Sequence, residues 1–98
     1  MSAAPGEIRH EGGEHGGSFF VERDGRRIAQ LTYRMAGADA MLDHTWVDPS
    51  LRGAGEAKRL VDAAAEWARR ERLKLVPACS YVRALFARSS AYADVQKR

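Results

Sequence analysis

Arg52, Gly53 and Gly55 are the residues whose types and spacing point most directly to chemistry. They follow a strand-like run and open the best helical pattern in the chain. A Gly-rich turn at a helix N-terminus aims backbone N–H groups at one point, where the helix dipole adds positive charge. Glycine leaves the backbone open to a ligand, and Arg52 adds a fixed charge. The segment predicts a site for a pyrophosphate or a similar anion; the plain alternative is a helix capped by a Gly-rich turn.

The spacing of this loop excludes two common phosphate-binding motifs. A nucleotide P-loop needs Gly, four residues, Gly, then Lys and Ser or Thr, and that pattern is absent. A dinucleotide fingerprint needs a third glycine at the position where Lys58 stands. What remains is an Arg-x-x-Gly-x-Ala pattern made by Arg52, Gly55 and Ala57.

Cys79 and His44 are the two candidate catalytic side chains. Cys79 lies between a predicted strand end and a helix start, where N–H groups and the helix dipole lower a thiol pKa and favour the thiolate nucleophile. His44 stands near a strand end, and an imidazole of near-neutral pKa suits a general base. The alternatives are a small buried hydrophobic residue for Cys79 and a hydrogen-bonded structural residue for His44. No metal-ligand set stands out, and Trp46 and Trp67 are interpreted as packing residues.

A sheet and two helices must position these residues. Aromatic and β-branched residues predict a strand over 18–23, and Asp24-Gly25 predicts the hairpin that returns it over 27–35. A third strand is expected over 40–47, so the three strands form an antiparallel meander. The expected core face of the middle strand consists of Ala29, Leu31, Tyr33 and Met35.

The N-terminal part is predicted to be mostly irregular. Residues 1–6 are expected to be a flexible tail, and an edge strand is expected to start within 7–10. Four glycines within 11–17 predict a turn or a mobile loop. His10 and His15 are interpreted as solvent-exposed loop residues.

The main helix is predicted over 53–72, followed by a short strand over 73–76 and a second helix over 80–88. The short strand is expected to run parallel to the third strand, because a helix joins the two. The last ten residues form a tail that Tyr92 and Val95 anchor. The apolar stripe of the main helix consists of Ala57, Leu60, Val61, Ala64 and Ala68.

Three segments in this order resemble the GCN5-related N-acetyltransferases, in particular their very small single-domain members of the YjdJ type. The segments are His44-Thr45-Trp46-Val47-Asp48-Pro49, Arg52-Gly53-Ala54-Gly55-Glu56-Ala57 and Pro77-Ala78-Cys79-Ser80-Tyr81-Val82. The resemblance implies a minimal α/β (α+β) fold: the three-stranded meander, a helix, a short parallel strand and a second helix. Two residues depart from the family pattern, since Trp46 replaces a frequent acidic residue and Glu56 an aliphatic one.

The resemblance implies binding of acetyl-coenzyme A and transfer of its acetyl group to an unknown amine, on a small molecule or a protein. Cys79 would lie near the thioester and could accept the acetyl group first, whereas direct attack by the amine needs only a base such as His44. Tyr81 could protonate the departing thiolate or pack against the helix. The implied cofactor-binding residues are Thr45, Trp46, Val47, Arg52, Gly53, Ala54, Gly55, Glu56, Ala57 and Lys58.

Two alternatives stay open. The first is a module that binds coenzyme A or acyl-coenzyme A without catalysis, because full-sized family members carry further strands that form much of the acceptor wall. The second is an interaction protein that kept the fold and lost the cofactor. Glu56 favours this second alternative, since it adds negative charge near the proposed phosphates.

Length and composition predict the number of domains, the cellular location and the kinds of partner. At 98 residues the chain is one domain over 1–98 with one modest core. A single cysteine, the absence of a signal pattern and the lack of a long apolar run place the protein in the cytoplasm, away from membranes. A net charge of +3 is too small to predict nucleic-acid binding, and the cluster Arg69-Arg70-Glu71-Arg72 suits a helix C-terminus. A monomer or a weak dimer is expected.

Overall fold

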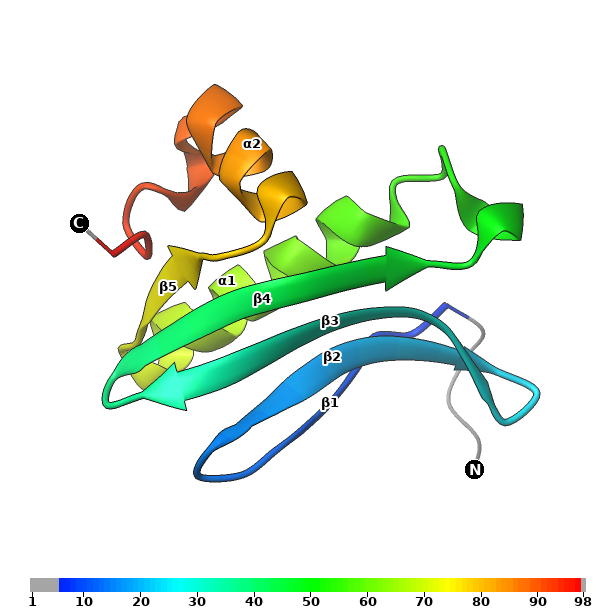
Figure 1. The fold of residues 1–98 in the computed structure, drawn as a ribbon, viewed down its shortest axis with the longest axis horizontal. Helices are drawn as coiled ribbons and strands as arrows, with labels where there is room; N and C mark the ends of the chain where they lie inside the picture. The colour runs from blue at the N-terminus through cyan, green and yellow to red at the C-terminus, as the bar shows by residue number, and fades with distance from the viewer. Residues whose placement is uncertain (1–5, 98) are drawn as a thin grey trace.

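A computed structural model describes residues 6–97 as one five-stranded sheet with two helices (Figure 1). The strands lie side by side in sequence order; β1 to β4 are antiparallel, and β5 runs parallel to β4. This architecture confirms the predicted fold class. The strands are β1 (Arg9–Gly12), β2 (Gly16–Arg23), β3 (Arg26–Ala36), β4 (Asp39–Val47) and β5 (Lys74–Pro77). The helices are α1 (Glu56–Glu71) and α2 (Ser80–Arg88), with two 3₁₀ turns, η1 (Pro49–Leu51) and η2 (Ser90–Tyr92).

Helix α1 joins β4 to β5 and crosses one face of the sheet, where it contacts β2, β3, β4 and β5. A parallel pair of strands needs such a crossover. The helix begins three residues later than predicted, at Glu56, because Gly53 and Gly55 have a left-handed backbone that no helix can contain. Its small alanines bring the helix close to the sheet. Its buried residues are Leu60, Val61, Ala64, Ala65 and Ala68, which include four of the five predicted for the apolar stripe.

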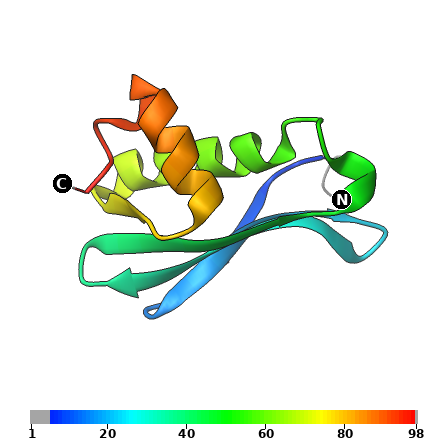
Figure 2. The same ribbon diagram turned by 45° about the horizontal axis from the view of Figure 1, so that its top comes forward.

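The core lies between α1 and the sheet, as the alternation in β3 predicts. Ala29, Leu31 and Tyr33 are buried, and Met35 is half-buried near the strand end. Helix α2 contacts β5 and η2, and Figure 2 shows it on the β5 side of α1. Trp67 packs against the edge of this core, as expected.

The Gly-rich segment 11–17 forms a hairpin, so the prediction of a turn holds only for residues 13–15. β1 begins at Arg9, as expected for an edge strand, but it continues to Gly12 and β2 begins at Gly16, so residues 11–12 and 16–17 are strand and not loop. A Cβ atom on Gly12 or on Gly17 would collide with the hydroxyl of Tyr33. Glycine is therefore selected here by the close approach of a side chain from β3, and not by a lack of regular structure.

His10 lies in β1 and not in a loop, although it is exposed as predicted. Its ring stacks on Phe19 with 4.1 Å between the ring centroids, and its Nε2 atom lies 2.6 Å from the Tyr33 hydroxyl oxygen. Burial by these neighbours lowers the pKa of His10 below its usual value, and the positive charge of Arg70 lowers it further. The imidazole is thus part of the packing that holds the edge strand on the sheet.

The C-terminal residues cover the outer edge of β5. The backbone N–H of Leu75 donates to Val95 O over 2.7 Å, and the N–H of Lys97 donates to Leu75 O over 2.8 Å. Tyr92 and Val95 are buried, which confirms that they anchor the tail. The tail predicted for residues 1–6 lies outside the described residues, except for Gly6. Over residues 6–97, no helix is long and apolar enough to cross a membrane.

Candidate functional site

Strands β4 and β5 pair at their beginnings and then diverge. The pairs run from Asp39↔Lys74 to Leu42↔Pro77, and Ala78 N donates to Leu42 O over 3.1 Å. β4 then continues to Val47, while the chain after β5 turns into α2 (Figure 1). In the described part of the chain, the second half of β4 therefore has no strand beside it on the β5 side.

A β-bulge in β4 decides which side chains face this opening. β4 has one extra residue, Asp43, relative to β3. The extra residue shifts the alternation, so Leu42 is buried, Asp43 and His44 both turn outward, and Thr45 and Val47 point to the side of the pocket described below. His44 is exposed and does not line that pocket, so the structure does not bring this predicted base to the site.

A tight turn leads from β4 into α1. Asp48 caps η1, because its carboxylate accepts hydrogen bonds from Ser50 N over 3.0 Å and from Ser50 Oγ over 2.7 Å. The bond from the Ser50 backbone, followed by that from the hydroxyl, lowers the pKa of Asp48. Gly53 and Gly55 then adopt φ angles of +88° and +80°, in the left-handed region that favours glycine.

The turn leaves a row of backbone N–H groups free. The first backbone bond at the start of α1 runs from Arg59 N to Gly55 O over 3.1 Å. A Cβ atom built on Gly53 or Gly55 meets nothing within 4 Å, so a ligand can reach this backbone. Unpaired N–H groups at a helix start carry partial positive charge. Within residues 6–97, no acceptor pairs with the N–H groups of Gly53, Gly55, Glu56, Ala57 and Lys58.

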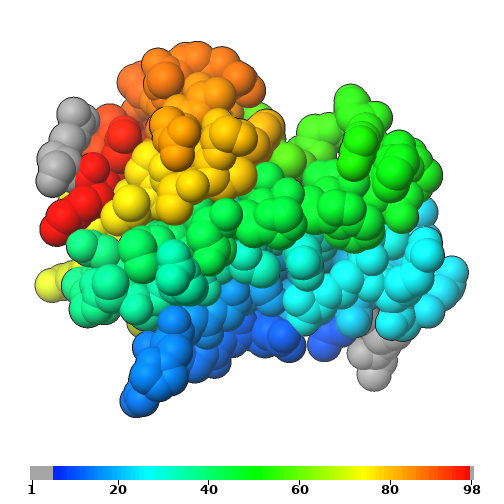
Figure 3. Space-filling view, in the orientation of Figure 1, coloured from blue at the N-terminus to red at the C-terminus, as the bar shows by residue number. Residues whose placement is uncertain are grey.

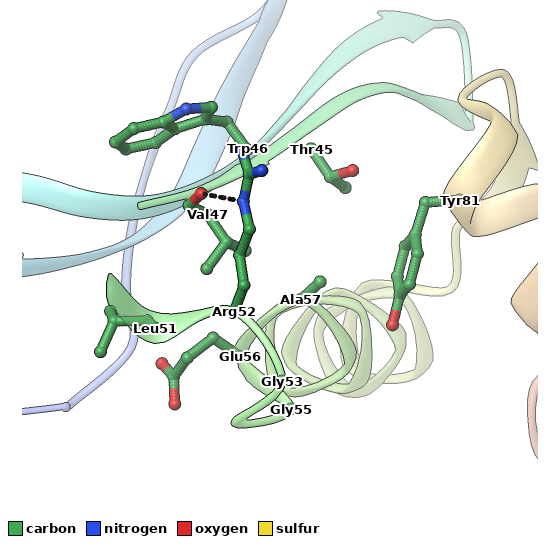
Figure 4. Close-up of a pocket in the computed structure, with 10 residues that line it drawn as sticks. All are labelled: Thr45, Trp46, Val47, Leu51, Arg52, Gly53, Gly55, Glu56, Ala57 and Tyr81. Carbon is green, nitrogen blue, oxygen red and sulfur yellow. Dashed lines mark hydrogen bonds between the residues drawn. The ribbon is translucent and has the colours of Figure 1, made fainter. Parts of the chain in front are cut away.

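These elements surround a pocket of about 450 Å³. Figure 3 shows it as a notch between the loop, in green, and α2, in orange. Arg52 folds back over it, and its Nε atom donates to Val47 O over 3.3 Å, so the Val47 carbonyl faces the pocket (Figure 4). Eight of the ten predicted cofactor residues line the pocket, and Ala54 and Lys58 do not. The lining residues are Thr45, Trp46, Val47, Leu51, Arg52, Gly53, Gly55, Glu56, Ala57 and Tyr81.

The Lys58 side chain points along α1 and away from the loop. Its Nζ atom lies 3.0 Å from Asp62 Oδ2, one helical turn further on. The hydrogen bond to Asp62 and the charge of that carboxylate raise the pKa of Lys58. The backbone N–H of Lys58, by contrast, belongs to the row of N–H groups without an acceptor in residues 6–97.

Cys79 is the N-cap residue of α2 and reaches the pocket only through Thr45. Its Sγ atom lies 3.5 Å from Thr45 Oγ1. Burial raises the pKa of the Cys79 thiol, but the hydrogen bond with Thr45 and longer approaches of the Val82 and Tyr81 N–H groups outweigh burial, so the pKa lies below its usual value. The lowered pKa increases the share of thiolate that this half-buried thiol forms at a given pH.

Three residues of the lining compare differently with the sequence-based predictions. Trp46, interpreted as a packing residue, is 36% exposed and lines the pocket. Tyr81 lines the pocket from α2, across from Arg52 (Figure 4). Leu51 was not predicted, and its only signal is an apolar side chain in an otherwise polar turn. In residues 6–97, no three His, Cys, Asp or Glu side chains gather as metal ligands would.

Both the sequence and the fold of this chain are similar to those of known proteins. Residues 18–95 match the family model described as GCN5-related N-acetyl-transferase. The chain is 30% identical to a GCN5-like protein of Staphylococcus aureus solved by NMR, with a TM-score of 0.75, and the match covers 97% of this chain and 91% of that one. Among curated proteins, no match is found.

Larger acetyltransferases share the fold over part of their length. The ribosomal-protein-S18-alanine N-acetyltransferase of Escherichia coli is 20% identical, with a TM-score of 0.58, over 64% of this chain and 41% of its own. An aminoglycoside N-acetyltransferase in complex with coenzyme A is 24% identical, with a TM-score of 0.53, over 64% of this chain and 54% of its own. At these identities the likeness extends to the fold alone.

Proposed function

Because this chain belongs to the GCN5-related N-acetyltransferase family, we propose that it binds acetyl-coenzyme A in the pocket between the loop, β4 and α2 and transfers the acetyl group to an amine. The observation that carries the proposal is the row of free N–H groups at the start of α1, which lies beside the unpaired half of β4. Coenzyme A needs both features, since it combines a pyrophosphate with a long arm that contains amide groups.

The pyrophosphate would bind to the free N–H groups between Gly53 and Lys58. Their partial positive charge, added to that of the helix dipole, stabilises an anion at this point. The open space beside Gly53 and Gly55 supports this assignment, because phosphate oxygens need direct access to the backbone. Arg52 would leave Val47 O and pair with the phosphates, which bind a guanidinium more strongly than a carbonyl does.

The amide-bearing arm would lie along the free edge of β4. The Val47 carbonyl faces the pocket, and the backbone groups of Thr45 lie on the same edge because strand groups alternate. An extended arm can bond to these groups as an added strand does. Val47, Leu51 and Ala57 supply apolar surface on either side of it.

The acetyl group would reach the region of Thr45, Tyr81 and Cys79, and two routes of transfer follow. In the direct route the amine nitrogen attacks the thioester carbonyl, the bond to sulfur breaks, and coenzyme A leaves as a thiolate. In the two-step route the Cys79 thiolate attacks the thioester carbonyl and displaces the coenzyme A thiolate, and the amine then attacks acetyl-Cys79 and restores the Cys79 thiolate. In both routes the amine loses a proton and the coenzyme A thiolate gains one, for which Tyr81, a residue of the pocket lining, is the candidate acid. His44 stays a predicted base for the amine, although its exposed position does not support that role.

A coenzyme A-binding module without transfer is the second candidate function. The chain spans only 41% and 54% of the larger acetyltransferases that share its fold. The parts that it lacks relative to them include elements that could hold an acceptor. In this second candidate function, coenzyme A binds at the same site, but no acetyl group is transferred.

Calorimetric titration with acetyl-coenzyme A, followed by intact-mass measurement, tests the proposal. The matched variants are Gly55→Val and Gly37→Val, because both glycines have a left-handed backbone and open space around them. Gly37 lies in the β3–β4 turn, away from the pocket. We expect Gly55→Val to abolish binding and Gly37→Val to retain it.

The mass measurement separates the routes. An acetyl adduct that disappears in Cys79→Ser supports the two-step route, and acetylation of an added amine without such an adduct supports the direct one. Binding without any transfer favours the second candidate. If the natural chain binds neither acetyl-coenzyme A nor coenzyme A, the proposal is wrong.

A further inference from the structure

Glu56 brings a carboxylate to the place where the proposed phosphates would bind. It is the first residue of α1, it lines the pocket together with Gly53 and Gly55, and its side chain is only 15% exposed. A carboxylate that solvent reaches so little is weakly screened and repels a nearby anion more than a surface carboxylate does. Left unbalanced, Glu56 would weaken the binding of a pyrophosphate group.

Arg59 balances this charge from the next turn of the helix. Its Nη1 atom lies 2.9 Å from both carboxylate oxygens of Glu56. Residues three apart lie on the same side of a helix, which brings the two side chains together. Arg59 itself does not line the pocket, so its guanidinium acts on the site through Glu56.

The main chain before β1 holds the other end of the guanidinium. Arg59 Nη2 donates to the carbonyl oxygen of Gly6 over 2.6 Å. Gly6 lies three residues before β1, whose pairing with β2 begins at Arg9. Arg59 is thus fixed between a carboxylate and a carbonyl, and Figure 4 shows the Glu56 carboxylate turned away from Gly53 and Gly55.

We infer that Arg59 is a positioning residue of the proposed cofactor site: held by the Gly6 carbonyl, it neutralises Glu56 and keeps its carboxylate away from the phosphates. This inference rests on the proposed function and adds a role for the segment that precedes β1. It also accounts for Glu56, one of the two residues that depart from the family pattern. The carboxylate does not spoil the anion site, because its charge is balanced within the same helix.

Arg69 provides a matched control within α1. It pairs with Glu66, three residues earlier, over 2.9 Å and donates to the carbonyl oxygen of Ala91 over 2.9 Å. These two contacts match those of Arg59, and Arg69 also pairs with the Asp94 carboxylate over 2.7 Å. Arg69→Gln therefore removes at least as many contacts from α1 as Arg59→Gln does, without being near the pocket. Arg69 lies about 15 Å further along the helix, beyond the screening length of ~8 Å at physiological ionic strength.

The test is a double-mutant cycle with Arg59→Gln, Glu56→Gln and the double variant, with Arg69→Gln as the control. Calorimetry gives the Kd for coenzyme A, and the amide NMR shifts of Gly53 and Gly55 give the Kd for inorganic pyrophosphate. We expect Arg59→Gln to weaken both ligands by about fivefold. We expect the double variant to bind within about twofold of Glu56→Gln, and Arg69→Gln to bind within about twofold of the natural chain.

Each result decides between the two proposals. If Arg59→Gln weakens ligand binding by the same factor in the natural chain and in Glu56→Gln, Arg59 contacts the ligand directly. If Arg69→Gln weakens binding as much as Arg59→Gln does, the substitutions act through the fold alone. Either result overturns the inference. Binding of coenzyme A that Arg59→Gln leaves unchanged overturns the inference and keeps the proposed function. If the variants change the Kd for pyrophosphate as expected but the natural chain does not bind coenzyme A, the inference stands and the proposed function is wrong. If neither ligand binds, both are wrong.

Discussion

Two pairs of glycines in this protein serve opposite purposes. Gly53 and Gly55 adopt a left-handed backbone, and the space beside them is open. Gly12 and Gly17 lie in paired strands, and the space beside them is filled by Tyr33. The first pair keeps the backbone accessible to a ligand, whereas the second lets a buried tyrosine hydroxyl come close to the main chain. Composition cannot separate the two uses, because only the surrounding structure shows what takes the place of the missing Cβ atom.

The comparison predicts that substitutions at the two pairs affect different properties. At the hairpin, a methyl group meets atoms that cannot move, so stability is lost. At the loop, a methyl group meets only solvent, so the cost is backbone strain together with the loss of ligand binding.

Gly17→Ala is expected to have the largest effect on stability. The added Cβ atom would collide with the carbonyl oxygen of Glu11 and with the Tyr33 hydroxyl, and a backbone atom cannot move aside. We expect a loss of about 2–4 kcal/mol in the free energy of unfolding, measured in urea. Gly13→Ala, in the same turn but with nothing within 4 Å, should change stability by less than about 1 kcal/mol. Equal effects at Gly13 and Gly17 would contradict the close-packing account of the hairpin.

Gly55→Ala should affect ligand binding more than stability, the opposite of Gly17→Ala. Because Gly55 has a φ angle of +80° and open surroundings, alanine is strained there without a collision, at a cost of about 1–2 kcal/mol. We expect a larger proportional loss in affinity for acetyl-coenzyme A, about tenfold or more, since the methyl group shields the N–H groups that bind phosphate. Urea unfolding and calorimetry on the same sample provide both numbers. A variant that loses stability but keeps full affinity would remove Gly55 from the proposed site.

Thr45→Val should raise the pKa of Cys79. Burial alone raises the pKa of this thiol, and the hydrogen bond with the Thr45 hydroxyl is the first of the contacts that reverse the shift. Valine cannot form that bond, so the thiolate should form at higher pH. The measurement is the rate of iodoacetamide alkylation against pH, followed by intact mass. Thr32→Val, which removes a hydrogen bond to Asp43 on the outward face, is the control and should leave the alkylation profile unchanged.

His10 should make stability fall slightly at mildly acidic pH. Burial, and then the charge of Arg70, lower the pKa of His10 in the folded protein, while the unfolded chain keeps an ordinary value of about 6.5. Below this value the unfolded state binds more protons, so stability falls as pH drops from about 6.5 towards the lowered pKa of the folded state. The effect should be the smallest of the four, because His10 is exposed.

Comparing the unfolding free energy at pH 7.5 and pH 5.5 tests this dependence. His10→Phe keeps the stacking on Phe19 but cannot titrate, so it should show a smaller decrease on acidification. A decrease of the same size in the variant would assign the dependence to other groups.

The elements of the fold followed from local patterns in the sequence. The alternation in β3 predicts its buried face, and the period of the apolar residues predicts the inner side of α1. The extension of β1 and β2 through the Gly-rich segment did not follow, because its glycines are explained by Tyr33, which lies far away in sequence. A pattern that depends on a contact between distant residues cannot be recognised from the local sequence.

The parts of the site that are continuous in sequence were predicted, but the contacts between distant parts of the chain were not. The loop was predicted from its own residues and the end of β4 from the resemblance to a known family, and eight of those ten residues line the pocket. The positions of His44 and Tyr81 depend on the bulge at Asp43 and on the start of α2, which no local pattern reveals. Arg59 was not predicted either, because its role depends on a carbonyl group at Gly6.

An amide NMR titration of the natural chain with acetyl-coenzyme A decides whether the cofactor binds at the start of α1. The amide signals of Gly12, Gly17, Gly53 and Gly55 appear in one spectrum, so their shifts can be compared in the same sample. We predict saturable shifts at Gly53 and Gly55, accompanied by Thr45 and Val47, with little change at Gly12 and Gly17. Shifts confined to the hairpin, or no saturable shift at the loop, would contradict the assignment of a coenzyme A site to the start of α1.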